Sequence, residues 1–344
     1  MSVNNHYIQA IDYLNHHQNT WLVTGGAGFI GSNLIEFLLD KGQLVVALDN
    51  YSTGSPLNIE KLTNLAKTKN CLQNFIFVEN DIRNLSACRE IIVGVDYVLH
   101  QAAIGSVPRS IDDPVNTHES NMNGFLNILL ASKDAKVKRF VYASSSSIYG
   151  DSSDSPKKEH HSGRLLSPYA VTKATNELYA SVFSEVFCFK SIGLRYFNVF
   201  GNRQDPKGPY AAVIPKWISS MLNQEDLYIN GDGSTSRDFC YITNVIQANI
   251  LAALTTKEEA LDQVYNIALN QETTLNELFQ IIKLNINKYM PEIKVMDPIY
   301  RDFRKGDIKH SRADISKAES LLGYKTMKTT SQGLEELIKM ECKK

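Results

Sequence analysis

A glycine-rich turn sets the strongest constraint on how this chain folds. The turn, Gly25-Gly26-Ala27-Gly28-Phe29-Ile30-Gly31, follows a short apolar run at residues 21–24 and precedes helical periodicity over residues 32–39. Glycines at this spacing let the backbone approach a pyrophosphate closely, and the amide groups at a helix N-terminus attract that anion. Glycine turns also occur for geometry alone, but the order of strand, turn and helix predicts a dinucleotide-binding unit.

Short apolar runs alternate with longer helical segments through the first part of the chain. The runs expected to form strands are residues 21–24, 44–48, 75–78, 97–100, 140–143 and 191–195. Helices are expected at residues 5–17, 32–39, 116–133 and 169–187. This alternation predicts an α/β fold with a doubly wound parallel Rossmann sheet and helices on both of its faces.

The alternation loosens after residue 195 into loops that contain glycine and proline. We therefore expect a Rossmann domain over residues 1–197, with an N-terminal helical extension, and a smaller C-terminal α/β substrate lobe over residues 198–344. The chain is expected to cross back to the first domain around residues 238–270. A short helix is predicted over residues 313–322.

Composition excludes several classes of protein. The chain has 36 Lys and Arg against 37 Asp and Glu, so no overall field favours nucleic acid or a membrane. Its five cysteines are scattered, which predicts neither a disulfide framework nor a metal site. The first twenty residues lack the apolar run of a signal peptide, and no later run is long enough to span a bilayer. A cytoplasmic protein is expected.

Asp49 ends the second predicted strand, at the distance from the glycine turn where a carboxylate binds the adenosine ribose of a dinucleotide. The alternative is that Asp49 only caps a turn. The residues after it include no Lys or Arg for a 2′-phosphate, which favours NAD over NADP. The residues expected to bind NAD are Gly25, Gly28, Phe29, Ile30, Gly31, Asp49, Asn50, Ser52, Thr53, Gly54, Asp81, Ile82, Gln101, Ala102 and Ala103, with Tyr169 and Lys173.

Tyr169 and Lys173 lie four residues apart in a segment that Ser167 and Pro168 should begin as a helix. An ammonium near a tyrosine favours phenolate and so lowers a pKa that is normally about 10. The same spacing occurs on many surface helices without any chemistry. A serine run, residues 144–147, makes the chemical interpretation stronger because it ends the fifth predicted strand, where α/β sheets bind their ligands.

These motifs together resemble the extended short-chain dehydrogenase/reductases, and within them the UDP-hexose 4-epimerases. The matching stretches are TGGAGFIGSNL (24–34), ASSSSIYG (143–150), SPYAVTK (167–173), LRYFNVFG (194–201), YINGDG (228–233), SRDFCYI (236–242) and FRKGD (303–307). HQAA (100–103), GSVPRS (105–110) and AAVIPK (211–216) are similar to epimerases that act on UDP-N-acetylglucosamine. The resemblance implies that Ser145, Tyr169 and Lys173 are catalytic.

The resemblance also implies a reaction and a substrate site. The reaction would interconvert UDP-N-acetylglucosamine and UDP-N-acetylgalactosamine through a 4-keto sugar, in a homodimer paired through helices 116–133 and 169–187. A small residue, Ser311, would leave room for the acetamido group. The substrate-binding residues would be Ser106, Ser145, Ser146, Tyr169, Asn198, Val213, Lys216, Tyr228, Asn230, Arg237, Arg304, Asp307 and Ser311.

Four alternatives remain open. The substrate could be UDP-N-acetylglucosaminuronate and its 4-epimer. A 4,6-dehydratase or a uronate decarboxylase would share the fold, the cofactor and the Tyr–Lys pair, but a dehydratase needs an added acid and base where this chain has serines. A non-catalytic NAD sensor or scaffold should lack Tyr169 or Lys173.

Overall fold

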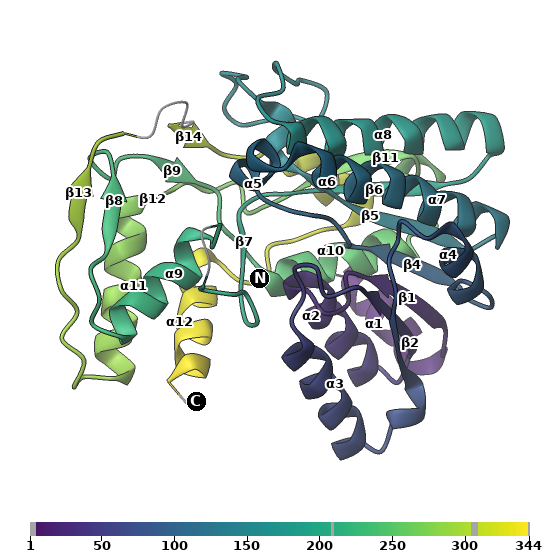
Figure 1. The fold of residues 1–344 in the computed structure, drawn as a ribbon, viewed down its shortest axis with the longest axis horizontal. Coiled ribbons are helices and arrows are strands. Elements are labelled where there is room, and N and C mark those ends of the chain that lie inside the picture. The colour runs from purple at the N-terminus through teal and green to yellow at the C-terminus, as the bar shows by residue number, and fades with distance from the viewer. Residues whose placement is uncertain (1–4, 208–209, 304–308, 343–344) are drawn as a thin grey trace.

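The computed structural model describes residues 5–207, 210–303 and 309–342. Its centre is a parallel sheet of seven strands in the order β11-β6-β5-β4-β1-β2-β3 (Figure 1). The strands are β1 (Thr20–Thr24), β2 (Leu44–Asp49), β3 (Phe75–Glu79), β4 (Tyr97–His100), β5 (Arg139–Ser145), β6 (Ser191–Tyr196) and β11 (Gln263–Ile267). The predicted doubly wound parallel sheet is confirmed. Its order reverses between β1 and β4, and such a reversal opens a crevice at the carboxyl ends of the strands.

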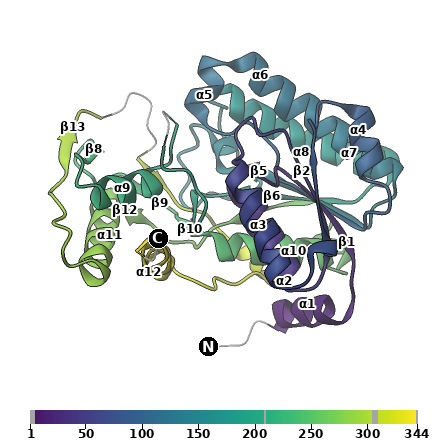
Figure 2. The ribbon, with the colours of Figure 1, turned by 60° about the horizontal axis from the view of Figure 1, so that its bottom comes forward.

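Helices cover both faces of this sheet (Figures 1 and 2). On one face α4 (Leu85–Ile91) packs on α7 (Gly124–Asp134), which packs on α8 (Pro168–Phe187). On the other face α2 (Phe29–Asp40) contacts both α3 (Pro56–Thr68) and α10 (Ile242–Leu254). The N-terminal helix α1 (Asn5–His16) packs against α10.

The strands are apolar on both sides because each side meets a helical layer. Along β1, Trp21 and Val23 belong to one hydrophobic cluster, while Leu22 belongs to the other. All three side chains are fully buried. This burial on two faces explains why the strands appear in the sequence as continuous apolar runs and not as alternating patterns.

The rest of the second half forms small sheets and helices beside the carboxyl ends of the large sheet (Figure 1). Two of the small sheets have two strands: β8 (Tyr228–Asn230) pairs with β13 (Ile299–Arg301), and β7 (Val199–Phe200) pairs with β10 (Cys240–Tyr241). The third has three strands in the order β12 (Thr273–Thr274), β9 (Ser236–Arg237) and β14 (His310–Ser311). The helices are α9 (Val213–Leu222), α11 (Leu275–Tyr289) and α12 (Thr330–Glu341). β11 and α10, from the second half, pack with the large sheet, and the division at residue 197 stays a prediction.

Two predicted helices differ from the structure. The helix expected at residues 116–133 consists of α6 (Pro114–His118), a wider π-helical segment (Glu119–Asn123) and α7. Within that segment, Asn121 bonds to the backbone of Ile104. The predicted start of the helix at 313–322 was wrong. Ala313 forms a β-bridge with Lys157, and the helical segment begins at residue 316.

Among the described residues, none of the helices combines the length and apolar character needed to cross a membrane.

Candidate active site

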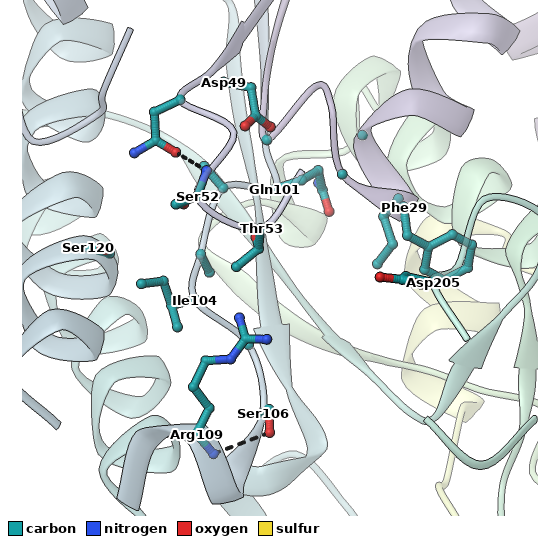
Figure 3. A pocket seen from close by; sticks show the side chains of 18 of the residues that line it. Phe29, Asp49, Ser52, Thr53, Gln101, Ile104, Ser106, Arg109, Ser120 and Asp205 are labelled. Carbon is teal, nitrogen blue, oxygen red and sulfur yellow. Dashed lines mark hydrogen bonds between the residues drawn. The ribbon is translucent and has the colours of Figure 1, made fainter. Parts of the chain in front are cut away.

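A pocket of about 430 Å³ opens where the glycine turn meets the carboxyl ends of β2 and β4. Figure 3 shows Asp49 at one end of it and Ser106 and Arg109 at the other, with Thr53 and Gln101 between them. The predicted residues that line it are Gly25, Gly28, Phe29, Ile30, Gly31, Asp49, Asn50, Ser52, Thr53, Asp81, Ile82, Gln101, Ala102, Ala103 and Ser106. The structure therefore brings nearly all of the predicted cofactor residues together.

The glycine turn leaves no room for side chains. Gly25 has a φ of +69°, and a Cβ added to it would lie 2.8 Å from the backbone nitrogen of Ala102. A Cβ on Gly31 would lie 2.1 Å from the carbonyl oxygen of Gly25. Gly28 precedes α2 and offers no side-chain cap, so the first amide groups of this helix remain for an anion. This backbone cradle fits a dinucleotide pyrophosphate.

Asp49 is held by the glycine turn and by the turn that follows β2. Its Oδ2 accepts a hydrogen bond from the amide of Ala27 at 3.0 Å, and its Oδ1 accepts one from the amide of Tyr51 at 2.7 Å. Burial raises the pKa of this carboxyl, and the backbone hydrogen bonds oppose the rise. Asn50 donates to Asp81 at 2.7 Å, which joins the ends of β2 and β3. The pocket-lining residues directly after β2, Asn50, Ser52 and Thr53, include no cation for a 2′-phosphate, which favours NAD over NADP.

Gly54 is not among the pocket-lining residues. It packs behind Asp49, since a Cβ at this position would lie 2.9 Å from the Asp49 Oδ1. Gly54 supports the carboxylate instead of forming part of the wall.

The helix that carries Tyr169 and Lys173 begins as predicted. Ser167 caps α8 by accepting from the amide of Ala170 at 3.1 Å, and Pro168 takes the first helical position. The amide of Tyr169 donates to Ser110 at 3.1 Å. Ser110 lies on the short helix α5 (Val107–Asp112), which also contributes Arg109 to the pocket. The start of α8 is thereby fixed to the pocket wall.

Lys173 points toward the end of β5. Its Nζ donates to the carbonyl oxygen of Ala143 at 2.8 Å and lies 5.9 Å from the centre of the Tyr169 ring. The pKa of Lys173 is lowered to about 8, because burial lowers it by more than the charge of Glu177 raises it. Burial raises the pKa of Tyr169, while the hydroxyl of Ser145 lowers it. The lowered tyrosine pKa expected from the sequence is not found, because burial outweighs the neighbouring groups.

The serine run lies at the end of β5. Ser145 ends the strand and accepts from the amide of Ser147 at 3.1 Å, while Ser144 donates to Glu177 at 2.5 Å on α8. Ser146 starts the following 3₁₀ turn and is half-buried. Ser145, Ser146, Tyr169 and Lys173 are not among the pocket-lining residues. The amide of Tyr169 is bonded to Ser110, the residue after the pocket-lining Arg109.

The predicted substrate residues are more widely spread. Arg237 on β9 and Ser311 on β14 are paired in register. Asn198 donates to the carbonyl oxygen of Asp238 at 3.2 Å. The predicted residues Val213 and Lys216 lie in the first turn of α9, just after Ala211 and Ala212, which line the pocket. Tyr228 and Asn230 lie on β8, and Arg304 and Asp307 lie outside the described residues.

Sequence reasoning did not assign part of the pocket wall. The guanidinium of Arg109 lies 4.9 Å from the centre of the Tyr210 ring, and the Tyr210 hydroxyl donates to Asp112 at 2.6 Å. Two stretches quoted for the family resemblance, GSVPRS (105–110) and AAVIPK (211–216), contain part of this wall, but no site role was predicted for the wall residues within them. The unassigned lining residues are Leu48, Asn80, Ile104, Gly105, Arg109, Ser120, Gln204, Asp205, Lys207, Tyr210, Ala211 and Ala212.

Comparisons with known proteins agree with this geometry. The model of the NAD dependent epimerase/dehydratase family matches residues 21–268. A UDP-glucuronate 4-epimerase of Thermodesulfobacterium geofontis is 32% identical over 92% of this chain and 94% of its own. A solved structure of a UDP-N-acetylglucosamine 4-epimerase from Methanobrevibacter ruminantium, in complex with UDP-N-acetylmuramic acid, matches with a TM-score of 0.83 and 37% sequence identity. The match covers 95% of this chain and 97% of that protein.

A third relative carries the cofactor. The structure of a UDP-glucuronic acid 4-epimerase from Bacillus cereus, with UDP-glucuronic acid and NAD, has a TM-score of 0.81, 32% identity, and covers 94% of this chain and 99% of its own. The extent of these matches, together with the cradle and the helix that carries Tyr169, shows that the chain belongs to the NAD dependent epimerase/dehydratase family, as an extended short-chain dehydrogenase/reductase of the UDP-hexose epimerase type.

Proposed function

We propose that this protein is a 4-epimerase that interconverts UDP-N-acetylglucosamine and UDP-N-acetylgalactosamine. The observation that carries the proposal is the meeting of Tyr169, Lys173 and Ser145 at the end of β5, beside a pocket that fits a dinucleotide. A relative with the same overall fold is named a UDP-N-acetylglucosamine 4-epimerase.

In this proposal the chain's own residues move one proton. Tyr169 removes the proton of the sugar 4-hydroxyl and later returns it, and Ser145 holds that hydroxyl by a hydrogen bond. Lys173 steadies the tyrosine and the nicotinamide ribose. The glycine turn and Asp49 would hold NAD, which would supply reversible hydride transfer at carbon 4; the 4-keto sugar, once turned, would regain its hydrogen on the opposite face. The configuration at carbon 4 is inverted, with no net redox change.

The UDP group would be held from the second half of the chain. Arg237 can form forked hydrogen bonds to a pyrophosphate, and Lys216 on α9 adds a second cation. Asn198, Val213, Tyr228 and Asn230 are the other described candidates. This anchoring lets the sugar ring turn while the nucleotide stays in place. Ser311, beside Arg237 in the register of β9 and β14, would leave space for an acetamido group.

A second candidate is 4-epimerisation of the corresponding uronate. Arg109 favours it, because a cation at the Ser106 end of the pocket suits a carboxylate at carbon 6. The dehydratase alternative has less support. Glu177 is bonded to the end of β5, but Arg195 holds its carboxylate at 2.7 Å, so it is engaged elsewhere.

We also propose a homodimer in which α8 takes part. Four apolar residues, Val171, Leu178, Val182 and Val186, lie on this helix and are between 45% and 68% exposed. Their spacing places them along one side of the helix, and a continuous exposed apolar stripe of this kind favours a protein interface.

A substrate screen with a matched variant tests the proposed reaction. Purified protein is incubated with UDP-glucose, UDP-N-acetylglucosamine or UDP-N-acetylglucosaminuronate, and NMR identifies the products. We expect 4-epimers without accumulation of NADH. Tyr169→Phe should keep fold and NAD binding but lower kcat by about 10²–10⁴-fold, since it removes the proton-transferring oxygen. Parental turnover by Tyr169→Phe, or steady NADH formation by the parent, would contradict the proposal.

A further inference from the structure

We propose that Glu177 is a positioning residue of this site: it keeps the Lys173 side chain in its ammonium form and fixes the end of β5 that carries Ser145. The inference rests on the roles proposed above for Tyr169 and Lys173. In this role Glu177 itself contacts neither the substrate nor the cofactor.

One face of α8 meets the end of one strand. Tyr169, Lys173 and Glu177 follow one another at intervals of four residues, so they lie on consecutive turns of the same helix face. Each acts on the last residues of β5: Tyr169 on Ser145, Lys173 on the Ala143 carbonyl, and Glu177 on Ser144. Helix and strand end are therefore joined at three successive strand residues, and Glu177 contacts the middle one, Ser144.

Glu177 is itself held firmly. Its Oε1 accepts from Ser144 at 2.5 Å and from the Nε of Arg195 at 2.9 Å, and its Oε2 accepts from the Nη2 of Arg195 at 2.7 Å. The two side chains are 13% and 6% exposed. A bidentate pair in a buried place has one geometry, so the negative charge stays at a fixed distance from Lys173.

Lys173 needs such a charge because it is only 2% exposed. An ammonium removed from water loses its hydration, and burial accordingly lowers its pKa to about 8. Glu177 acts in the opposite direction and favours the charged form. Without it, a larger part of Lys173 would be neutral at physiological pH.

The other titratable groups around Lys173 do not replace this charge. On its own helix, burial raises the pKa of Tyr169, so this side chain supplies no fixed negative charge beside Lys173. On β4, burial and the charge of Lys173 lower the pKa of His100 to about 3, so this ring is neutral too. On β6, Arg195 carries a positive charge and is paired with Glu177. Glu177 thus supplies the anion in the described surroundings of Lys173.

Glu177→Gln tests the inference without turnover. NMR titration of protein labelled at the lysine ε-carbon reports the pKa of Lys173, which we expect to fall by about 1 below its parental value of about 8. The alkaline limb of kcat/KM should move down in pH by the same amount, while the KM for the sugar nucleotide changes little. Ser144→Ala, which keeps the charge and removes only one hydrogen bond, should leave the pKa of Lys173 in place.

Glu177→Gln leaves Arg195 unpaired and can destabilise the fold. The double variant Glu177→Gln/Arg195→Gln avoids a lone buried charge; because the Arg195 cation is removed with the anion, a smaller fall in the Lys173 pKa is expected. An unchanged Lys173 pKa in either folded variant overturns the inference. If Glu177→Gln lowers the Lys173 pKa but the parent epimerises no sugar nucleotide, the role of Glu177 is supported and the proposed function is refuted.

Discussion

Gly25→Ala provides a quantitative test of the cofactor cradle. Gly25 has a φ of +69°, where an alanine costs about 1 kcal/mol more than glycine. Its new Cβ would lie 2.8 Å from the Ala102 nitrogen and 3.0 Å from the Gln101 carbonyl carbon, both of which belong to backbone that cannot rotate away. Forcing such a contact costs a further 1–3 kcal/mol or so. The variant should therefore lose about 2–4 kcal/mol of unfolding free energy.

The chain offers a matched control in Gly42. Its φ is +68°, but a Cβ added there would meet nothing within 4 Å. Gly42→Ala therefore carries the backbone strain without the contact. For a chain of 344 residues, 1 kcal/mol corresponds to about 1.5 °C in Tm. We expect a decrease of about 1.5 °C for Gly42→Ala and about 3–6 °C for Gly25→Ala.

The two variants should also separate in NAD binding. The added methyl group moves the glycine turn away from the backbone of Gln101 and Ala102, which form the facing wall of the pocket. Calorimetric titration should show at least about tenfold weaker binding for Gly25→Ala, which is about 1.4 kcal/mol, and parental binding for Gly42→Ala. Equal Tm values for the two variants, or parental NAD affinity in Gly25→Ala, would refute the reasoning.

Three further predictions follow from the site. Ser311→Tyr should lose activity on UDP-N-acetylglucosamine more than on an unacetylated sugar, and equal losses would exclude Ser311 from the pocket. Burial lowers the pKa of Lys173 from 10.5 to about 8, so unfolding takes up a proton between these values and the free energy of unfolding rises with pH there. In urea titrations, Lys173→Met should remove this increase of unfolding free energy with pH. The variant should lose activity but be more stable than the parent at pH 7, by up to about 3 kcal/mol. A lower unfolding free energy at pH 7 would contradict this prediction. Leu178→Glu should give a monomer in light scattering, and a monomeric parent at micromolar concentration would refute the proposed interface.

The sequence predicted those parts of the fold that local chemistry determines. Ser167 and Pro168 mark the start of α8 because capping and a fixed φ act within one turn. The glycine turn likewise predicted the cradle, since each of its constraints comes from neighbouring backbone. The strand bounds agree to within one or two residues because the runs are buried on both faces.

The features that the sequence did not reveal depend on distant partners. Ala313 was expected to be helical, but its amide donates to the buried carboxylate of Asp238 at 3.2 Å, and this contact holds it in an extended segment. β11 was not predicted as a strand, because its partner β6 lies far back along the chain. The lowered pKa expected for Tyr169 failed for the same reason, since burial is a property of the whole site.

The last strand of the sheet also has a consequence for synthesis. β6 pairs with β5 on one side and with β11 on the other, and β11 ends only at Ile267. While a ribosome produces the chain between Tyr196 and Ile267, β6 is an open, apolar edge that a neighbouring nascent chain can join. A fragment that stops at residue 197 keeps this edge permanently, so it should aggregate instead of serving as a separate NAD-binding module.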